Sequence, residues 1–124
     1  MRLLAWNIRQ GGGSRLGRIA DALARHEADI LVLSEYRGGE SATRLLEVLS
    51  TLGYAYVTVL APPPRFNGVL IAARCPFLEH TGIGSGLPEP YRVVSVEFAA
   101  FRLIGIYMPN LLAKIPYWEA LSPP

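Results

Sequence analysis

The order of apolar runs in the first 33 residues constrains the fold more than any other feature of the sequence. Residues 3–8 form a short apolar run, which Gly11-Gly12-Gly13 interrupts because glycine readily adopts turn conformations. Ser14 is expected to cap a helix whose apolar side chains recur at helical spacing, at Leu16, Ile19, Ala20 and Leu23. Residues 30–33 form a second apolar run. This order predicts a βαβ unit, with two parallel strands joined by a right-handed crossover.

After residue 40 the pattern changes to one further helix and then to short strands. A helix is expected at residues 41–52, with an apolar stripe of Leu45, Leu46, Leu49 and Leu52. Strands are expected at residues 54–60, 68–73, 91–98 and 102–108, and the third alternates like a half-buried strand. Their connections are mostly too short for crossover helices, which favours antiparallel hairpins. Residues 81–90 are expected to form a loop, and a helix is expected to begin near Pro116.

The composition describes one small, apolar domain. A chain of 124 residues has room for a single core, and 51% hydrophobic with 18% charged residues excludes a disordered chain. Mean hydropathy of +0.27 is high for a soluble domain of this size, which fits either a β-rich core or apolar surface meant for a partner layer. The net charge of +2 is too small to indicate a partner.

The sequence has few features that would place it outside the cytoplasm. Cys75 is the single cysteine, so an internal disulfide and a thiolate zinc cluster are excluded. No apolar run approaches the roughly 20 residues that span a membrane, and the opening is too short for a signal peptide. A cytoplasmic location is expected.

Two polar side chains follow the predicted parallel strands. Asn7 lies near the end of the first strand and Glu35 just past the end of the second. Because parallel strands joined by one crossover end at the same edge of a sheet, the amide and the carboxylate should converge there. Magnesium is commonly held by one or two protein carboxylates, with water and substrate phosphates in its other positions. The alternatives are an asparagine that caps a turn and a solvated glutamate.

Four segments resemble successive motifs of the endonuclease/exonuclease/phosphatase family. They are AWNIR at residues 5–9, DILVLSE at 29–35, NGVLIA at 67–72 and IGIYMPN at 104–110. The resemblance implies an α/β fold that is part of a four-layer sandwich, with a mixed β-sheet and helices on one face. It also implies that residues 1–124 are a single partial domain, the N-terminal half of the family's fold.

The same resemblance implies a metal-dependent phosphodiesterase, most simply a nuclease, that uses Mg²⁺ or Mn²⁺. Asn7 and Glu35 would form the metal site. Tyr107 would reach the scissile phosphate through its hydroxyl, and Asn110 would contact a substrate phosphate. The partner would be nucleic acid or another phosphodiester, and the choice among DNA, RNA, inositol phosphates and lipid head groups stays open.

The sequence departs from the family pattern in two ways. Ser34 stands where many members have glutamine before the glutamate. The family's second half, which supplies an Asp/Asn pair and a Ser-Asp-His segment, has no counterpart here. His26 and His80 match no catalytic motif and are expected to be structural or exposed. The chain is therefore expected to lack a general base and to have little activity.

Two other functions remain possible. A strand, a glycine run and a helix followed by Glu35 imitate a dinucleotide-binding fingerprint, although Leu16 stands where a third glycine would be required. A non-catalytic interaction module is the other alternative. If the chain supplied one sheet of a sandwich, the apolar face left uncovered would invite homo-oligomerisation.

Overall fold

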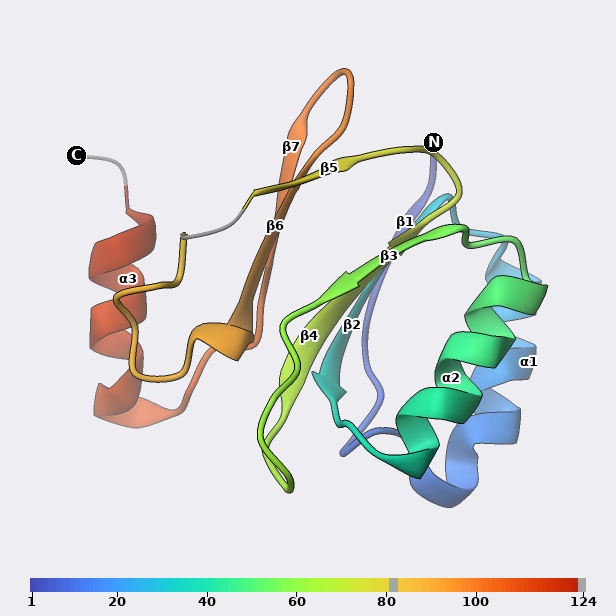
Figure 1. Ribbon diagram of the computed structural model, residues 1–124, viewed down its shortest axis with the longest axis horizontal. Helices are drawn as coiled ribbons and strands as arrows, with labels where there is room; N and C mark the ends of the chain where they lie inside the picture. The colour runs from blue at the N-terminus through green and yellow to red at the C-terminus, as the bar shows by residue number, and fades with distance from the viewer. Residues whose placement is uncertain (81–82, 123–124) are drawn as a thin grey trace.

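The computed structural model describes residues 1–80 and 83–122, which form two sheets between helices (Figure 1). The first sheet has the strand order β1-β2-β4-β3. Its strands are β1 (Leu3–Asn7), β2 (Ile30–Tyr36), β4 (Gly68–Ala73) and β3 (Tyr56–Val59). β1 is parallel to β2, whereas β4 is antiparallel to both of its neighbours. The expected βαβ unit is confirmed, and the antiparallel β4 beside β2 excludes the doubly wound parallel sheet of a dinucleotide-binding fold.

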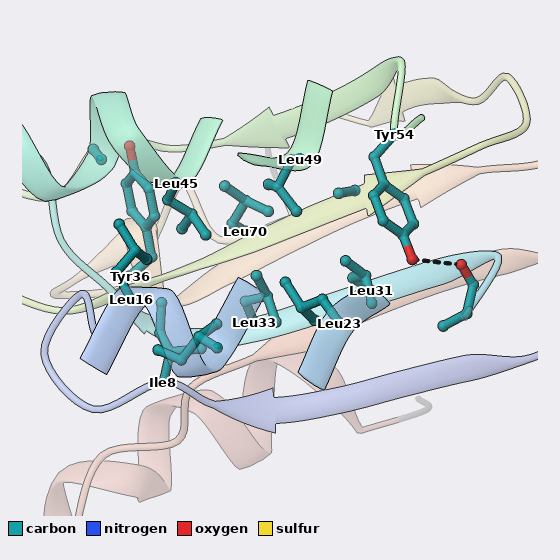
Figure 2. Packing of buried hydrophobic residues seen from close by; sticks show 14 residues of the cluster. Ile8, Leu16, Leu23, Leu31, Leu33, Tyr36, Leu45, Leu49, Tyr54 and Leu70 are labelled. Carbon is teal, nitrogen blue, oxygen red and sulfur yellow. Dashed lines mark hydrogen bonds between the residues drawn. The ribbon is translucent and has the colours of Figure 1, made fainter. Parts of the chain in front are cut away.

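Two helices, α1 (Leu16–His26) and α2 (Glu40–Thr51), cover one face of this sheet. The sheet presents Leu31, Leu33 and Leu70 to the helices, which contribute Leu23 and Leu45 to the same core (Figure 2). Each of these five side chains is almost fully buried. Such a core is the main source of folding free energy in a domain of this size.

Two details of the expected helices are wrong. A 3-10 turn at Gly13–Arg15 precedes α1, so Arg15 occupies the N-cap position and Ser14 caps nothing. On α2, Leu46 is 38% exposed, and the buried side chains are Ala42, Leu45 and Leu49. Leu46 points away from the sheet because the buried face of this helix is narrower than the leucine pattern suggests.

The second sheet is antiparallel, with the order β5-β6-β7. Its strands are β5 (Leu78–His80), β6 (Val93–Glu97) and β7 (Arg102–Ile106). It packs on the first sheet through Val94, Val96 and Phe98. At Gly105 the sheets come very close, because a Cβ atom there would lie 3.0 Å from a Val69 methyl group and 3.1 Å from one of Val32.

The helix α3 (Ile115–Leu121) lies on the outer face of the second sheet and follows a 3-10 turn at Leu111–Lys114. Its Tyr117 is buried against Leu87 and Val93. β6 is therefore covered on both faces, and the expected half-buried alternation at residues 91–98 is wrong. Residues 93–96 are all buried.

The layers follow one another as helices, sheet, sheet and helix (Figure 1). The expected fold class is thus confirmed: an α/β fold with a mixed sheet and two helices on one face of it. The chain supplies strands of both sheets, so the expectation of a single uncovered sheet is wrong. Each sheet ends in two edge strands, β1 and β3 in the first sheet and β5 and β7 in the second. No helix of residues 1–80 and 83–122 is long and apolar enough to cross a membrane.

Candidate metal and phosphate site

The C-terminal ends of β1 and β2 bring Asn7 and Glu35 together. Asn7 is paired in register with Ser34, the residue before Glu35. The Asn7 side chain donates a hydrogen bond from Nδ2 to Glu35 Oε2 over 2.5 Å. The amide and the carboxylate thus share one rim of the sandwich. The C-terminal ends of β1 and β2, which carry them, lie at the lower end of the view in Figure 1.

Glu35 lies at an irregularity in β2. The pairing of β2 with β4 shifts register between Ser34 and Tyr36, and Glu35 adopts a φ of 60°. A left-handed conformation is unfavourable for a side chain of this type, and such irregularities commonly aim a side chain away from the sheet. Here the carboxylate Oε1 accepts a hydrogen bond from the Gln10 N–H over 3.2 Å.

Asn7 is held by a second hydrogen bond. Its Oδ1 accepts from the Arg9 N–H over 2.9 Å, which fixes the carboxamide with its NH₂ group toward Glu35. The oxygen retains one lone pair. The side chain can therefore orient the carboxylate and still offer an acceptor at the rim.

One carboxylate and one amide fit a hard cation such as Mg²⁺, which completes its coordination with water and substrate oxygens. They do not fit the closed nitrogen and sulfur sites of zinc. Among the residues that the structure describes, no group of three or more His, Cys, Asp or Glu side chains could hold a metal ion.

Tyr107 directly follows β7 and is fixed by Arg92. The Arg92 guanidinium lies 4.8 Å from the centre of the Tyr107 ring, and its Nη1 donates to the Tyr107 carbonyl over 3.1 Å. The Tyr107 N–H donates to the Arg92 carbonyl over 2.8 Å. Glu89 forms an ion pair with the same guanidinium. Such a cation over an aromatic face restricts the ring.

Tyr107 and Glu35 lie at the same end of the sandwich. Arg92 follows Tyr91, whose carbonyl lies 3.0 Å from the position of a Cβ on Gly68. Gly68 is paired with Tyr36, next to Glu35. Asn110 lies just beyond Tyr107 and is exposed at the start of the turn before α3, with no side-chain hydrogen bond capping that turn.

A basic groove begins at Asn7 and follows α1. It has a volume of about 410 Å³ and is lined by Asn7, Trp6 and the four arginines Arg9, Arg15, Arg18 and Arg25, together with Ile8, Ile19 and Ala22. The lining contains no acidic side chain. A Nη2 group of Arg15 donates to the Arg9 carbonyl over 2.5 Å and so fixes one guanidinium at the rim. Clustered guanidinium groups of this kind attract phosphate.

A family model matches residues 4–118, and its description is the Endonuclease/Exonuclease/phosphatase family. The chain belongs to this family. The resemblance inferred from the four motifs is thereby confirmed, and the fold described above agrees with solved structures of similar proteins.

Three solved structures match 98% of the chain. An AP endonuclease from Archaeoglobus fulgidus is 21% identical with a TM-score of 0.76. The 3' phosphatase NExo from Neisseria, bound to product DNA hairpin, is 24% identical with a TM-score of 0.77. The 3'-5' exonuclease NExo from Neisseria meningitidis is 25% identical with a TM-score of 0.74. The chain spans 49%, 49% and 50% of these three structures, or about half of their length.

Both histidines of this family member lie away from the rim. His26 ends α1, and its carbonyl accepts a hydrogen bond from Arg2, which precedes β1 at the end opposite Asn7. His80 Nε2 lies 2.8 Å from Glu97 Oε2, at the end of β6 remote from Arg92. The hydrogen bond and the charge of His80 lower the pKa of the Glu97 carboxyl. Neither imidazole contacts Glu35 or Tyr107.

Sequence reasoning missed two contributors to the site. The backbone N–H groups of Arg9 and Gln10 hold Asn7 and Glu35, but neither residue is a glycine, so nothing in the sequence marked their left-handed backbone. Arg92 was missed because its partner Tyr107 is distant in sequence. The spacing of the arginines along residues 15–25 was visible in the sequence. Their position in one common groove was not, because the groove depends on β1 lying beside α1.

Proposed function

We propose that this chain forms the metal-binding half of a Mg²⁺-dependent phosphodiesterase, most simply a nuclease. The observation that carries the proposal is the 2.5 Å contact between Asn7 Nδ2 and Glu35 Oε2 at the ends of two parallel strands. Membership of a family named for nucleases and phosphatases supports the same reaction class. Mn²⁺ would occupy the same oxygen ligands.

Each rim residue has a role that follows from its chemistry. Glu35 would bind the cation, and Asn7 would hold the carboxylate in position. A bound Mg²⁺ supplies a Lewis acid that stabilises charge on a phosphate oxygen. Tyr107 would donate its hydroxyl proton in a hydrogen bond to a non-bridging oxygen of the scissile phosphate, as fixed donors in such sites do. Asn110 would donate from its exposed amide to a neighbouring phosphate.

Nucleic acid is the phosphodiester that the surface favours. Arg9 and Arg15 of the basic groove precede α1, and Arg18 and Arg25 lie on it, so several phosphates in a row would be bound on one side of the scissile one. A small substrate would use few of these guanidinium groups. One of the similar structures, NExo, is bound to a product DNA hairpin, which supports the same partner.

The isolated chain is expected to turn over little substrate. It spans about half of the similar structures, and both of its histidines lie at the end remote from the rim. A cation and fixed donors without a general base leave the attacking water unactivated. We therefore regard residues 1–124 as the N-terminal half of the domain.

Mn²⁺ titration tests the metal site directly. Paramagnetic line broadening of backbone amides in the chain should begin at residues 7–10 and 35. Glu35→Gln should weaken the binding about tenfold or more, because it removes the carboxylate that Asn7 and Gln10 hold at the rim. Glu40→Gln, an exposed change in the first turn of α2, is the matched control and should leave the affinity unaltered. Equal broadening in wild type and Glu35→Gln would contradict the proposal.

A further inference from the structure

Backbone strain is concentrated at the rim. Among the described residues, five that are not glycine have a positive φ, and three of them are Arg9 at 54°, Gln10 at 53° and Glu35 at 60°. The glycines at positions 11, 12 and 13 follow with φ of 80°, 86° and 49°, so residues 9–13 are all left-handed. L-residues avoid a left-handed run, and strain of this kind persists only where the surrounding structure imposes it.

The strained segment directs three successive N–H groups at the two site residues. Arg9 donates to Asn7 Oδ1 over 2.9 Å, Gln10 donates to Glu35 Oε1 over 3.2 Å, and Gly11 donates to the Glu35 carbonyl over 2.7 Å. A right-handed or extended backbone would turn these amides elsewhere. A turn that only reversed the chain direction would not need these three hydrogen bonds. The left-handed backbone of residues 9–11 therefore holds Asn7 and Glu35 in addition to reversing the chain.

We propose that residues 9–11 form a positioning clamp, whose backbone amides hold Asn7 and Glu35 in the geometry that accepts a cation. The clamp rests on the proposed function, because fixed oxygen atoms matter only where something binds them. Together with the Asn7 to Glu35 hydrogen bond, it constrains both oxygens of the carboxylate before any ligand arrives. Groups that orient metal ligands commonly contribute 10–100-fold, or about one to two decades, to metal affinity.

The clamp acts through the backbone of Gln10. The residue is exposed, and the hydrogen bond to Glu35 comes from its main-chain nitrogen. A glycine at this position would adopt the same φ without strain, whereas a β-branched residue would resist it strongly. Side-chain and backbone roles can therefore be separated by two substitutions at one position.

Gln10→Gly and Gln10→Val provide the test. Both remove the carboxamide side chain, but only valine opposes the left-handed backbone. Gln10→Gly should retain Mn²⁺ affinity within about twofold, and Gln10→Val should lose about tenfold or more. Unaltered binding in Gln10→Val, or an equal loss in both variants, would overturn the clamp.

A second pair of variants tests the same segment without changing Gln10. In Gly11→Ala the new Cβ would lie 3.2 Å from Arg37 Cβ at a φ of 80°, which should push the loop away from the end of β2. In Gly13→Ala the new Cβ would have no neighbour within 4 Å at a φ of 49°. Gly11→Ala should lose Mn²⁺ affinity as Gln10→Val does, and Gly13→Ala should not.

A measurement without metal distinguishes the clamp from the metal site. In the wild-type chain the Asn7 side-chain NH₂ group should exchange with solvent more slowly than that of a free asparagine side chain, because one of its protons is donated to Glu35 Oε2 and the carboxamide is fixed by the Arg9 N–H. Exchange should accelerate in Gln10→Val and Gly11→Ala while core amides such as that of Leu33 stay protected. If wild type binds no Mn²⁺, the metal proposal fails, and the exchange pattern alone decides the clamp. Fast Asn7 exchange in wild type would refute it.

Discussion

Tyr54 is the clearest case of one polar atom that supports an apolar core. Its ring is almost fully buried beneath the helices, and its hydroxyl donates to the Ala28 carbonyl over 2.6 Å (Figure 2). Tyr54→Phe should lower the free energy of unfolding by about 1–3 kcal/mol, because the buried carbonyl loses its partner. Urea denaturation measures this loss. Tyr56→Phe, at a 39% exposed side chain, is the control and should change stability by less than about 0.5 kcal/mol.

The Tyr54→Phe variant should also change how the stability of the fold depends on pH. Burial raises the pKa of Tyr54 above its ordinary value of 10.0, and this effect outweighs the neighbouring Arg74. A raised pKa contributes stability that is fully present below pH 10.0 and is lost as the pH rises through the folded-state pKa. Unfolding midpoints measured between pH 8 and 11 should therefore fall less steeply in Tyr54→Phe than in wild type. Parallel curves would contradict this assignment.

The site residues themselves were predictable to different degrees. Asn7 and Glu35 could be selected because each follows an apolar run, and parallel strand ends meet at one edge. The conformation that joins them could not be predicted from the sequence, since it depends on left-handed backbone at Arg9 and Gln10. The catalytic and substrate-binding roles of Tyr107 and Asn110 stay predictions.

Among the structural elements, the contact between the sheets is most sensitive at Gly105. Gly105→Ala should destabilise the fold by about 1–3 kcal/mol, because its Cβ would press on Val69 and Val32 and separate β7 from the first sheet. Gly17→Ala, in α1 with open space around it, should instead stabilise by about 0.5–1 kcal/mol. Thermal unfolding of both variants measures these changes in stability. If Gly105→Ala left the stability unchanged, the two sheets could adjust to accept the added Cβ atom.

Element prediction succeeded where local sequence decides and failed where packing decides. Residues 30–33 of β2 and residues 68–73 of β4 are continuous apolar runs in which all but Val32 are buried, so these strands were visible in the sequence. β6 resembled a half-buried strand because its second cover, Tyr117 of α3, lies about 20 positions further along the chain. No local sequence pattern predicts that the two sheets pack face to face.

At the scale of the whole molecule, edge strands offer unpaired backbone groups to a second chain. β1 and β7 are two of the four edge strands, and within β7 the side chains of Ile104 and Ile106 are 39% and 36% exposed. We propose that the isolated chain self-associates through this side, with a second copy covering the edge strands. The chain spans about half the length of the structures it matches, so two copies together would have the size of one of them.

Light scattering coupled to size-exclusion chromatography tests this self-association. The wild-type chain should elute as a dimer or larger species, and the double variant Ile104→Lys/Ile106→Lys should elute as a monomer with the same circular dichroism. Leu46→Lys, at an equally exposed leucine on α2, is the control and should stay associated. A monomeric wild type would exclude the homo-oligomer.

The hydrogen bonds around Glu35 also set an order of events during synthesis. Every group that holds its carboxylate belongs to residues 7–11, and the strand that carries it is complete at Tyr36. Synthesis runs from the N-terminus, whereas a domain generally folds as a unit. Every donor to the Glu35 carboxylate is therefore present in the chain before Tyr107 has been translated, so the residues proposed to bind the cation are complete before those proposed to contact phosphate.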